Sequence, residues 1–300
     1  MSFRLFNFFF KMRLRDAPCQ FLCFAISNSI PYRGWRRILK SMITILLHSS
    51  KTMVPVAASR PLSRPEFLSE AGSLAGYVQS LSPKTIAKVM HVSEKLADET
   101  VALMTQWSPD GEQSPAVETF RGDIYSGLRA LEFSESDKKF AQKHLRLLSG
   151  LYGILRPYDG VAPYRLEAGY RLPDEPYKNL YAYWGGKLAE TLPSSGSIIN
   201  LTSVEYQRLV LPHIDGTRVV TPRFLSRVNG SEPRFVVVHA KIARGAYARW
   251  LIRRGLPSAD GLDEFNDLGY RYDPTQSTPS EPVYICDDFK GIGLSQRLVN

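Results

Sequence analysis

The sequence predicts a mixed α/β (α+β) fold, with a central mixed sheet and surrounding helices in a single domain. Two short apolar runs, "ITILL" (43–47) and "IINLT" (198–202), are typical of buried strands. Long segments between them repeat apolar residues at helical spacing. The 300 residues are 44% hydrophobic and 22% charged, as in an ordinary globular chain. Because no breakpoint divides the later part, we predict one domain over 42–290, followed by a tail over 291–300.

The first 41 residues stand apart in charge. They carry eight basic residues against one acid, so that +7 of the total net charge of +9 lies in this segment. Any anion-binding site in the remaining chain must therefore rest on a local cluster. The segment has neither an apolar run long enough to span a bilayer nor the order of a secretory signal. We interpret it as an over-called translation start, with a mitochondrial transit peptide as the alternative.

The domain is predicted to begin at Met42 with the strand 43–47 and the loop "SSKT". Lys51 lies in that loop, where ligands of α/β sheets usually bind, although an exposed lysine without a role is the alternative. The loop lacks the G-x-x-x-x-G-K-[ST] pattern, which excludes a nucleotide-cradling P-loop.

Helical patterns follow. A helix is predicted from about Glu66, then Ser82 and Pro83 begin a second helix, and "EKLADETVALMTQW" forms a third after a tight connection. Ser134, with an aspartate three residues on, is expected to cap the helix "ESDKKFAQKHLRLLSG", which would end at Gly150.

The second half of the domain alternates between helical and strand patterns. A helix is predicted over roughly 178–191, ahead of the strands 198–202 and "TRVVT". The turn-like "NGSEP" is expected to close a hairpin between "PRFLSRV" and "RFVVVHA". A helix then covers 241–255, and a short strand "VYIC" lies in a tail rich in proline, serine and threonine.

The stretch "HLRLLSGLYGILRPYDGVAPYRLE" (144–167) holds more arginine and tyrosine than a connecting loop needs. Its residues of interest are Arg146, Tyr152, Arg156, Tyr158, Tyr164 and Arg165. Arginine presents a planar, charged fork that suits phosphate or carboxylate. Two interpretations stay open: the arginines line an anion site, or they brace a long buried loop by stacking on tyrosine.

Other motifs are less specific. In "FRGDIYSGL", an arginine beside an aspartate is often a structural ion pair. The acids of "LDEFNDLGYRYD" could hold a hard cation, but an exposed acidic turn is the simpler interpretation. The five histidines and three cysteines show no ligand spacing, and no G-x-S-x-G occurs. We therefore expect no metal and no cofactor.

At "FRGDIYSGL", "HLRLLSGLYGILRPYDGVAPYRLEAG", "LYAYWGGKL" and "IINLTSVEY" the sequence resembles the YaaA family of peroxide-stress proteins, over about residues 42–272. The resemblance implies a cytoplasmic protein that limits free iron and oxidative DNA damage, with a basic cleft in one α/β domain. It also implies DNA binding through a helix-hairpin-helix element, for which 81–104 is the candidate. The turn "MHVSEK" there lacks the usual glycines, and "HSSKT" stands where the family commonly has "SPAKT".

Carried over by position, the implied cleft residues are Lys51, Arg121, Asp123, Tyr125, Arg146, Tyr152, Arg156, Arg165, Glu167, Asn200 and Lys241. Lys84, Lys88 and Lys95 are expected to contact DNA backbone.

Three functions follow from this sequence. The first is a non-enzymatic protein, expected to be a monomer without membrane attachment, that binds double-stranded DNA. The second is an enzyme acting on a small anionic substrate in the same cleft, with Lys51 or Asp123 as acid, base or nucleophile. The third, direct iron sequestration, finds no recognisable ligand set. The cytoplasm is the expected location, or the mitochondrion if residues 1–41 are a transit peptide.

Overall fold

The computed structural model describes residues 42–214, 218–228, 230–255 and 257–291. The predicted extension over 1–41 and nearly all of the predicted tail lie outside the described residues. The predicted fold class is confirmed: the chain forms a mixed α/β fold around a five-stranded sheet with the strand order β6-β5-β1-β8-β9. These strands are β1 (Ile43–His48), β5 (Leu145–Ser149), β6 (Gly153–Leu155), β8 (Ser197–Asn200) and β9 (Arg218–Val220).

Strand β1 is the centre of this sheet. It pairs in parallel with β5 on one side and with β8 on the other, and β9 continues in parallel beyond β8. Only β6 is antiparallel, in a hairpin with β5. Because the chain leaves β1 toward one neighbour and later returns to the other, the carboxyl end of β1 is a topological switch point, where α/β sheets form ligand crevices.

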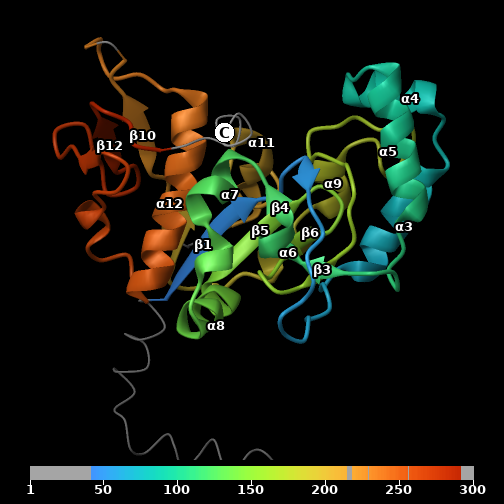
Figure 1. Cartoon of the computed structure of the whole chain (residues 1–300), viewed down its shortest axis with the longest axis horizontal. Coiled ribbons are helices and arrows are strands. Elements are labelled where there is room, and N and C mark those ends of the chain that lie inside the picture. Colours follow the sequence, from blue (N-terminus) through green and yellow to red (C-terminus); the bar gives the residue numbers. More distant parts are fainter. Residues whose placement is uncertain (1–41, 215–217, 229, 256, 292–300) are drawn as a thin grey trace, which may run out of the picture. The chain divides into compact units, whose positions relative to one another are not determined.

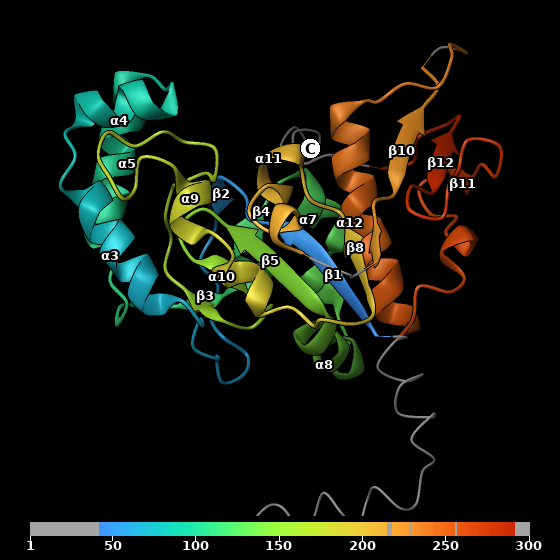
Figure 2. The ribbon, with the colours of Figure 1, turned by 180° about the vertical axis from the view of Figure 1, so that it is seen from behind.

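Helices cover both faces of the sheet. On the face seen in Figure 1 lie α7 (Asp123–Leu128), α8 (Glu135–His144) and α12 (Val237–Arg254). The view from behind in Figure 2 shows α9 (Leu180–Trp184), α10 (Lys187–Glu190) and α11 (Val204–Gln207) on the opposite face. None of the helices within the described ranges combines the length and the apolar character that a membrane span requires.

Three helices form a group beside α9: α3 (Leu68–Gln79), α4 (Pro83–Met90) and α5 (Glu94–Gln106). The predicted helix starts are confirmed, because the Ser82 hydroxyl accepts the Thr85 N–H and the Ser93 hydroxyl accepts the Leu96 N–H. The group joins the main core through α3, where Phe67 packs edge-on against Trp184.

The remaining elements are short. A second sheet has the order β10-β12-β11, from β10 (Arg223–Ser226), β12 (Val283–Cys286) and β11 (Tyr270–Tyr272). Two pairs complete the strands: β2 (Thr52–Met53) with β4 (Phe120–Arg121), and β3 (Ser114–Pro115) with β7 (Gly160–Val161). The helix α6 is Ala116–Thr119, and the 3-10 turns are η1 (Ala130–Glu132), η2 (Leu211–His213) and η3 (Leu262–Glu264).

The helix predicted to run to Gly150 is wrong at its end. The Ser134 capping box is confirmed, but α8 stops at His144 and 145–149 form strand β5. The leucines of "LRLLS" are buried beside β1, so pairing in the sheet overrides the helical periodicity. Arg146 in β5 caps the end of the helix, because its guanidinium donates to the last carbonyls of α8.

Two further local predictions are wrong. The hairpin of "PRFLSRV" and "RFVVVHA" does not form: β10 pairs in parallel with β12, and α12 already begins at Val237. A single bridge between Ser226 and Arg234 is what joins the two segments. The helix predicted over 178–191 is split into α9 and α10, because Gly185 adopts a positive φ of 50°.

The helices α7 and α12 cross in backbone contact. A Cβ added at Gly245 would lie 1.8 Å from the Ile124 carbonyl oxygen, and one at Gly127 would lie 2.0 Å from that of Ile242. Only glycine fits at either position, since the neighbouring atoms belong to backbone that no side-chain rotation can move away.

Gly245→Ala should therefore lower the free energy of unfolding by about 3 kcal/mol or more, at the upper end of overpacking effects. Gly72→Ala in α3 is the matched control, because an added Cβ there meets nothing within 4 Å. Helix propensity alone should then stabilise the protein by about 0.5–1 kcal/mol. Urea unfolding followed by circular dichroism measures both, and equal stability of the two variants would contradict the close crossing.

Candidate functional site

A cavity of about 400 Å³ opens at the carboxyl end of β1. Its walls come from the loop after β1, from α7 and the residues before it, from α12, and from the segments around Glu167 and Tyr206. The lining residues are His48, Ser49, Ser50, Lys51, Arg121, Gly122, Asp123, Ile124, Tyr125, Glu167, Ser203, Glu205, Tyr206 and Lys241. The cavity thus lies where the switch point of the sheet predicts a ligand crevice.

His48 forms part of its inner wall. The ring Nδ1 lies 2.9 Å from the Ser49 carbonyl oxygen, and the ring stacks on Tyr206 with centroids 4.5 Å apart. Burial, with the charges of Arg244 and Lys241, lowers the pKa of His48 from 6.5 to about 4. The imidazole is therefore neutral at physiological pH. Its Nε2 is buried and has no hydrogen-bond partner among the described residues.

A chain of hydroxyls connects the inner wall to the half-buried carboxylate of Glu167. The Tyr206 hydroxyl donates to Oε1 of Glu167 over 3.2 Å and lies 3.1 Å from Oγ of Ser49. Since the tyrosine gives its proton to the carboxylate, Ser49 is the donor to Tyr206. Burial raises the pKa of Glu167, while the nearby charge of Lys51 opposes the rise. Burial also raises the pKa of Tyr206, which keeps its hydroxyl protonated.

The wall from α7 and α12 is held to the same strand end. The Tyr125 hydroxyl donates to the His48 carbonyl over 2.9 Å, and burial keeps that phenol protonated by raising its pKa. The guanidinium of Arg121 donates to the carbonyls of Glu118 and Phe120, which fixes its position at the rim. Lys241 joins it from α12. The cavity therefore combines cations at the rim with acceptors on the wall.

Part of the predicted site lies together in this cavity: Lys51, Arg121, Asp123, Tyr125, Glu167 and Lys241. Two others are buried supports. The Tyr152 hydroxyl accepts from the Trp107 indole and from the Ala162 N–H. The Asn200 side chain bonds the hydroxyl of Thr202 and the amide of Gln207, which organises the turn after β8.

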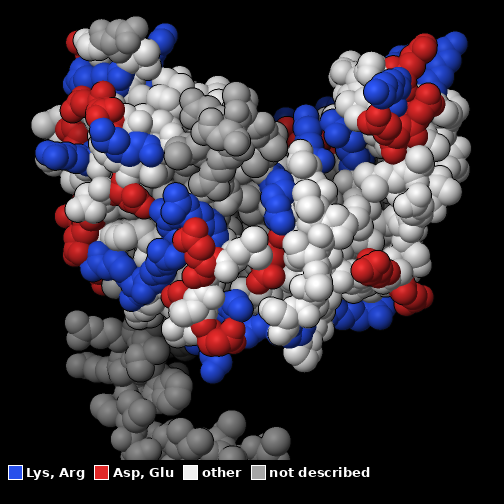
Figure 3. Space-filling model, in the orientation of Figure 1, with Lys and Arg blue, Asp and Glu red and all other residues white. Residues whose placement is uncertain are grey.

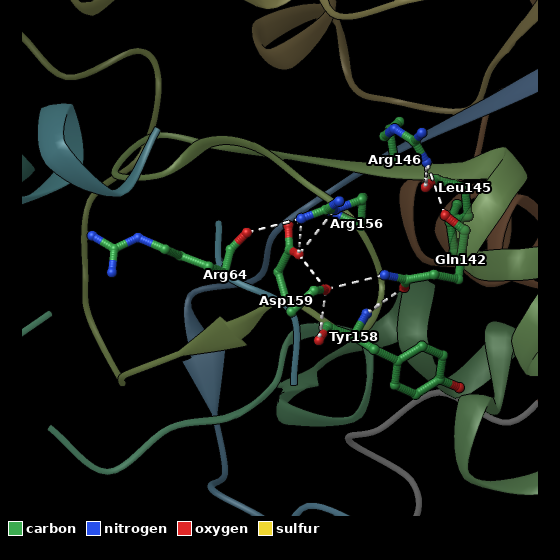
Figure 4. A network of polar contacts seen from close by, with 8 residues as sticks. Arg64, Gln142, Leu145, Arg146, Arg156, Tyr158 and Asp159 are labelled. Carbon is green, nitrogen blue, oxygen red and sulfur yellow. Dashed lines mark hydrogen bonds and ion pairs between the residues drawn. The ribbon is translucent and has the colours of Figure 1, made fainter. Parts of the chain in front are cut away.

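Arg146 and Arg156 are not among the residues that line the cavity, and their guanidinium groups are engaged within the protein (Figure 4). Arg146 donates to the carbonyls of Gln142, Lys143 and Leu145. Arg156 donates through Nε to the buried Asp159 at 3.1 Å and through Nη2 to the Arg64 carbonyl at 2.8 Å. This corresponds to the bracing interpretation, with carbonyls and a carboxylate in place of tyrosine faces. Arg165 lies near Glu167, where its charge opposes the rise in the Glu167 pKa that burial causes.

A second hollow, of about 760 Å³, lies beside α4. Its lining residues are Lys84, Thr85, Lys88, Val89, His91, Gly169, Tyr170, Arg171, Leu172, Pro173 and Lys178. Figure 3 shows blue Lys and Arg side chains in the hollow at the top of that view, beside the helices α3–α5. Lys95, in the first turn of α5, is exposed but does not line this groove. We call this hollow the α4 groove.

Sequence reasoning missed several residues of the cavity. His48 and Ser49 were missed because they are part of no histidine or nucleophile motif. Glu205 and Tyr206 were missed because they follow a different strand, far from His48 in the chain. One signal was present, because both segments come directly after predicted buried strands and parallel neighbours end at the same edge. In the described ranges, no group of three or more His, Cys, Asp or Glu residues is placed to hold a metal ion. Two acids of 263–267 instead pair with α12: Glu264 with Arg254, and Asp267 with Arg249.

Fold and site together define a class: a mixed α/β protein with a polar cavity at the switch point of its central sheet. A family model described as "Peroxide stress protein YaaA" matches residues 43–276, and the chain belongs to this family. A UPF0246 protein of Salinispora tropica is 49% identical over 256 residues, which are 84% of this chain and 97% of that relative. A UPF0246 protein of Marinomonas sp. (strain MWYL1) is 41% identical over 232 residues, covering 74% and 88%.

Arg156→Ala should destabilise the fold, because it removes two hydrogen bonds and leaves the buried Asp159 carboxylate with fewer partners. We expect a loss of about 1–3 kcal/mol in the free energy of unfolding. Arg64→Ala is the control, since Arg156 bonds its backbone carbonyl while its exposed side chain points away (Figure 4). Chemical denaturation measures both variants; an Arg156→Ala protein as stable as Arg64→Ala would show that the network contributes nothing.

The neutral His48 ring should make stability depend on pH. The folded pKa is near 4 and the ordinary value is 6.5, so the unfolded chain binds a proton first as the pH falls. The His48 contribution is thus present above pH 6.5 and is lost on the way to pH 4. His48→Phe, which keeps a stacked ring, removes it. In urea titrations, the free energy of unfolding of the wild type minus that of the variant should decrease as the pH falls from 6.5 to 4. A difference that does not change with pH would contradict the lowered pKa.

Proposed function

We propose that this chain acts in the peroxide-stress response by binding the backbone of double-stranded DNA, thereby limiting oxidative DNA damage. The observation that supports this best is the charge of the α4 groove, whose lining contains Lys and Arg side chains but no Asp or Glu. A duplex carries a phosphate charge about every 1.7 Å, so a groove of several exposed cations suits it. We further propose that the chain works as a cytoplasmic monomer.

The cations of the groove come from two walls. Lys84 and Lys88 lie one helical turn apart on α4, and both are exposed. Arg171 and Lys178 are also exposed and lie on the facing segment. Within the described part of the chain none of the four forms an ion pair, so their charges are available to phosphate. Contacts of this kind give affinity without reading sequence.

The turn between α4 and α5 takes the place of the helix-hairpin-helix turn. His91 adopts the left-handed conformation, with φ 52°, that a glycine would adopt more easily. The N–H groups of His91 and Val92 are already bonded to the Ala87 carbonyl. We therefore propose that phosphate contacts come from the lysines of α4, with Lys95 as a further contact, and not from the amides of the turn.

Lowered free iron is proposed to be an indirect result. Direct binding would need a set of His, Cys, Asp or Glu ligands, and within the described ranges no such group of three or more lies close enough together. A protein that covers DNA can lessen oxidative damage there without holding the metal itself.

The test is binding of a labelled duplex, followed by fluorescence anisotropy between about 50 and 200 mM salt. Both the full chain and the chain beginning at Met42 are used, so that the +7 segment over 1–41 is separated from the domain. Lys84→Ala/Lys88→Ala should weaken binding about tenfold or more. Each lost phosphate contact should also reduce the slope of log K against log salt by about one unit.

Lys139→Ala/Lys143→Ala is the matched control, because these two lysines are exposed on α8, away from the groove. This pair should leave both the affinity and the salt slope within about twofold. If the two double variants weaken binding equally, the affinity reflects overall charge and the α4 groove is not the DNA surface.

A second candidate function is favoured by a different observation. The cavity at β1 places cations and carboxylates around one space of about 400 Å³, which suits a small anionic molecule better than a duplex. In that role Lys51 and Asp123 would contact a substrate directly.

A further inference from the structure

The tautomer of His48 is fixed by its surroundings. The Ser49 backbone oxygen can only accept, so the Nδ1 atom 2.9 Å away must carry the ring proton. In a neutral ring, Nε2 is then a bare acceptor. This atom is buried, has no partner among the described residues, and belongs to a residue of the cavity wall. A buried acceptor without a partner is costly, which points to a ligand group that donates to it.

The rim of the same cavity is cationic. Lys51, Arg121 and Lys241 all line it, and within the described ranges none of them forms an ion pair. The Arg121 guanidinium is held by the Glu118 carbonyl, so its remaining N–H groups have a fixed direction. One planar fork and two ammonium groups around one space match a dianionic phosphate.

The remaining wall consists of acceptors. Glu167 accepts from Tyr206, and Glu205 accepts from the Gly169 N–H over 2.8 Å. Each carboxylate keeps free lone pairs, and Asp123 lines the cavity as well. A volume of about 400 Å³ exceeds what inorganic phosphate alone requires and lies in the range of small-molecule pockets. The complementary ligand carries one strong anion and several hydroxyl donors.

We propose that this cavity binds a phosphorylated sugar, free or within a nucleotide, with its phosphate at Lys51, Arg121 and Lys241 and a hydroxyl donating to Nε2 of His48. This inference rests on the second candidate function and names the ligand class for it. It is independent of DNA binding at the α4 groove, because Lys84 and Lys88 are not among the residues that line this cavity.

The test is calorimetric titration of the full chain with inorganic phosphate, ribose 5-phosphate and AMP. Ribose 5-phosphate should bind about tenfold tighter than inorganic phosphate, because the sugar adds hydrogen bonds to the acceptor wall. AMP binding tighter still identifies a nucleotide site, and AMP binding no better identifies a free sugar phosphate site. Equal binding of phosphate and ribose 5-phosphate, or no binding of any probe, overturns the proposal.

His48→Phe keeps the ring stacked on Tyr206 but removes Nε2. It should reduce the tenfold advantage of ribose 5-phosphate, because one acceptor of the wall is lost, while leaving phosphate binding within about twofold. Lys51→Ala should weaken both probes, and Lys143→Ala on α8 should weaken neither. An unchanged advantage in His48→Phe refutes the role of the imidazole.

If His48→Phe does not fold, nitrogen-15 NMR of the wild-type imidazole decides the point. Nε2 should show the shift of an unprotonated nitrogen and move when ribose 5-phosphate is added, but not with inorganic phosphate. A protonated Nε2, or a shift that ribose 5-phosphate leaves unchanged, overturns the assignment. Since no DNA is used, failure here is distinct from failure of the DNA-binding proposal.

Discussion

The backbone contact between α7 and α12 is the constraint on which the site depends. Gly127 and Gly245 let the two helices approach until a carbonyl of each helix lies against the glycine of the other, Ile242 against Gly127 and Ile124 against Gly245. The residues next to these two isoleucines face the end of β1, so one crossing fixes both walls of the cavity. Close packing of this kind tolerates no added methyl group, which makes the position of the walls rigid.

Burial then sets the protonation of the cavity. Desolvation disfavours charge, so the His48 ring is neutral, the phenols of Tyr125 and Tyr206 stay protonated, and the pKa of Glu167 rises. The cations sit nearer the rim, where Lys51 is exposed. The result is a cavity with cations at its mouth and hydrogen-bond acceptors on its inner wall, and a ligand with an anionic end and a hydroxylated end matches that order.

The cavity and the α4 groove differ in the charges that line them but share one segment. Glu167 lies on the cavity, while Gly169 and Arg171 lie on the groove two and four residues later. The Gly169 N–H is bonded to Glu205, which itself lines the cavity. The groove holds exposed cations suited to a polymer, and the cavity holds mixed charges suited to a small molecule. The stretch 144–167 that looked like a site in the sequence therefore reaches the cavity at Glu167, and the residues directly after it reach the groove, although Arg156 within the stretch serves to hold Asp159.

Local chemistry was readable from the sequence: the buried strand at 43–47, the serine caps at Ser82 and Ser134, and Lys51 after the first strand were all predicted. The family followed from its motifs as well. Tertiary structure alone decided that "LRLLS" is a strand, because burial beside β1 outweighs helical periodicity. It alone also decided that His48 faces the same cavity as Glu167 and Lys241. These residues are far apart in the chain, and only sheet order and helix crossing, which no local pattern encodes, bring them together.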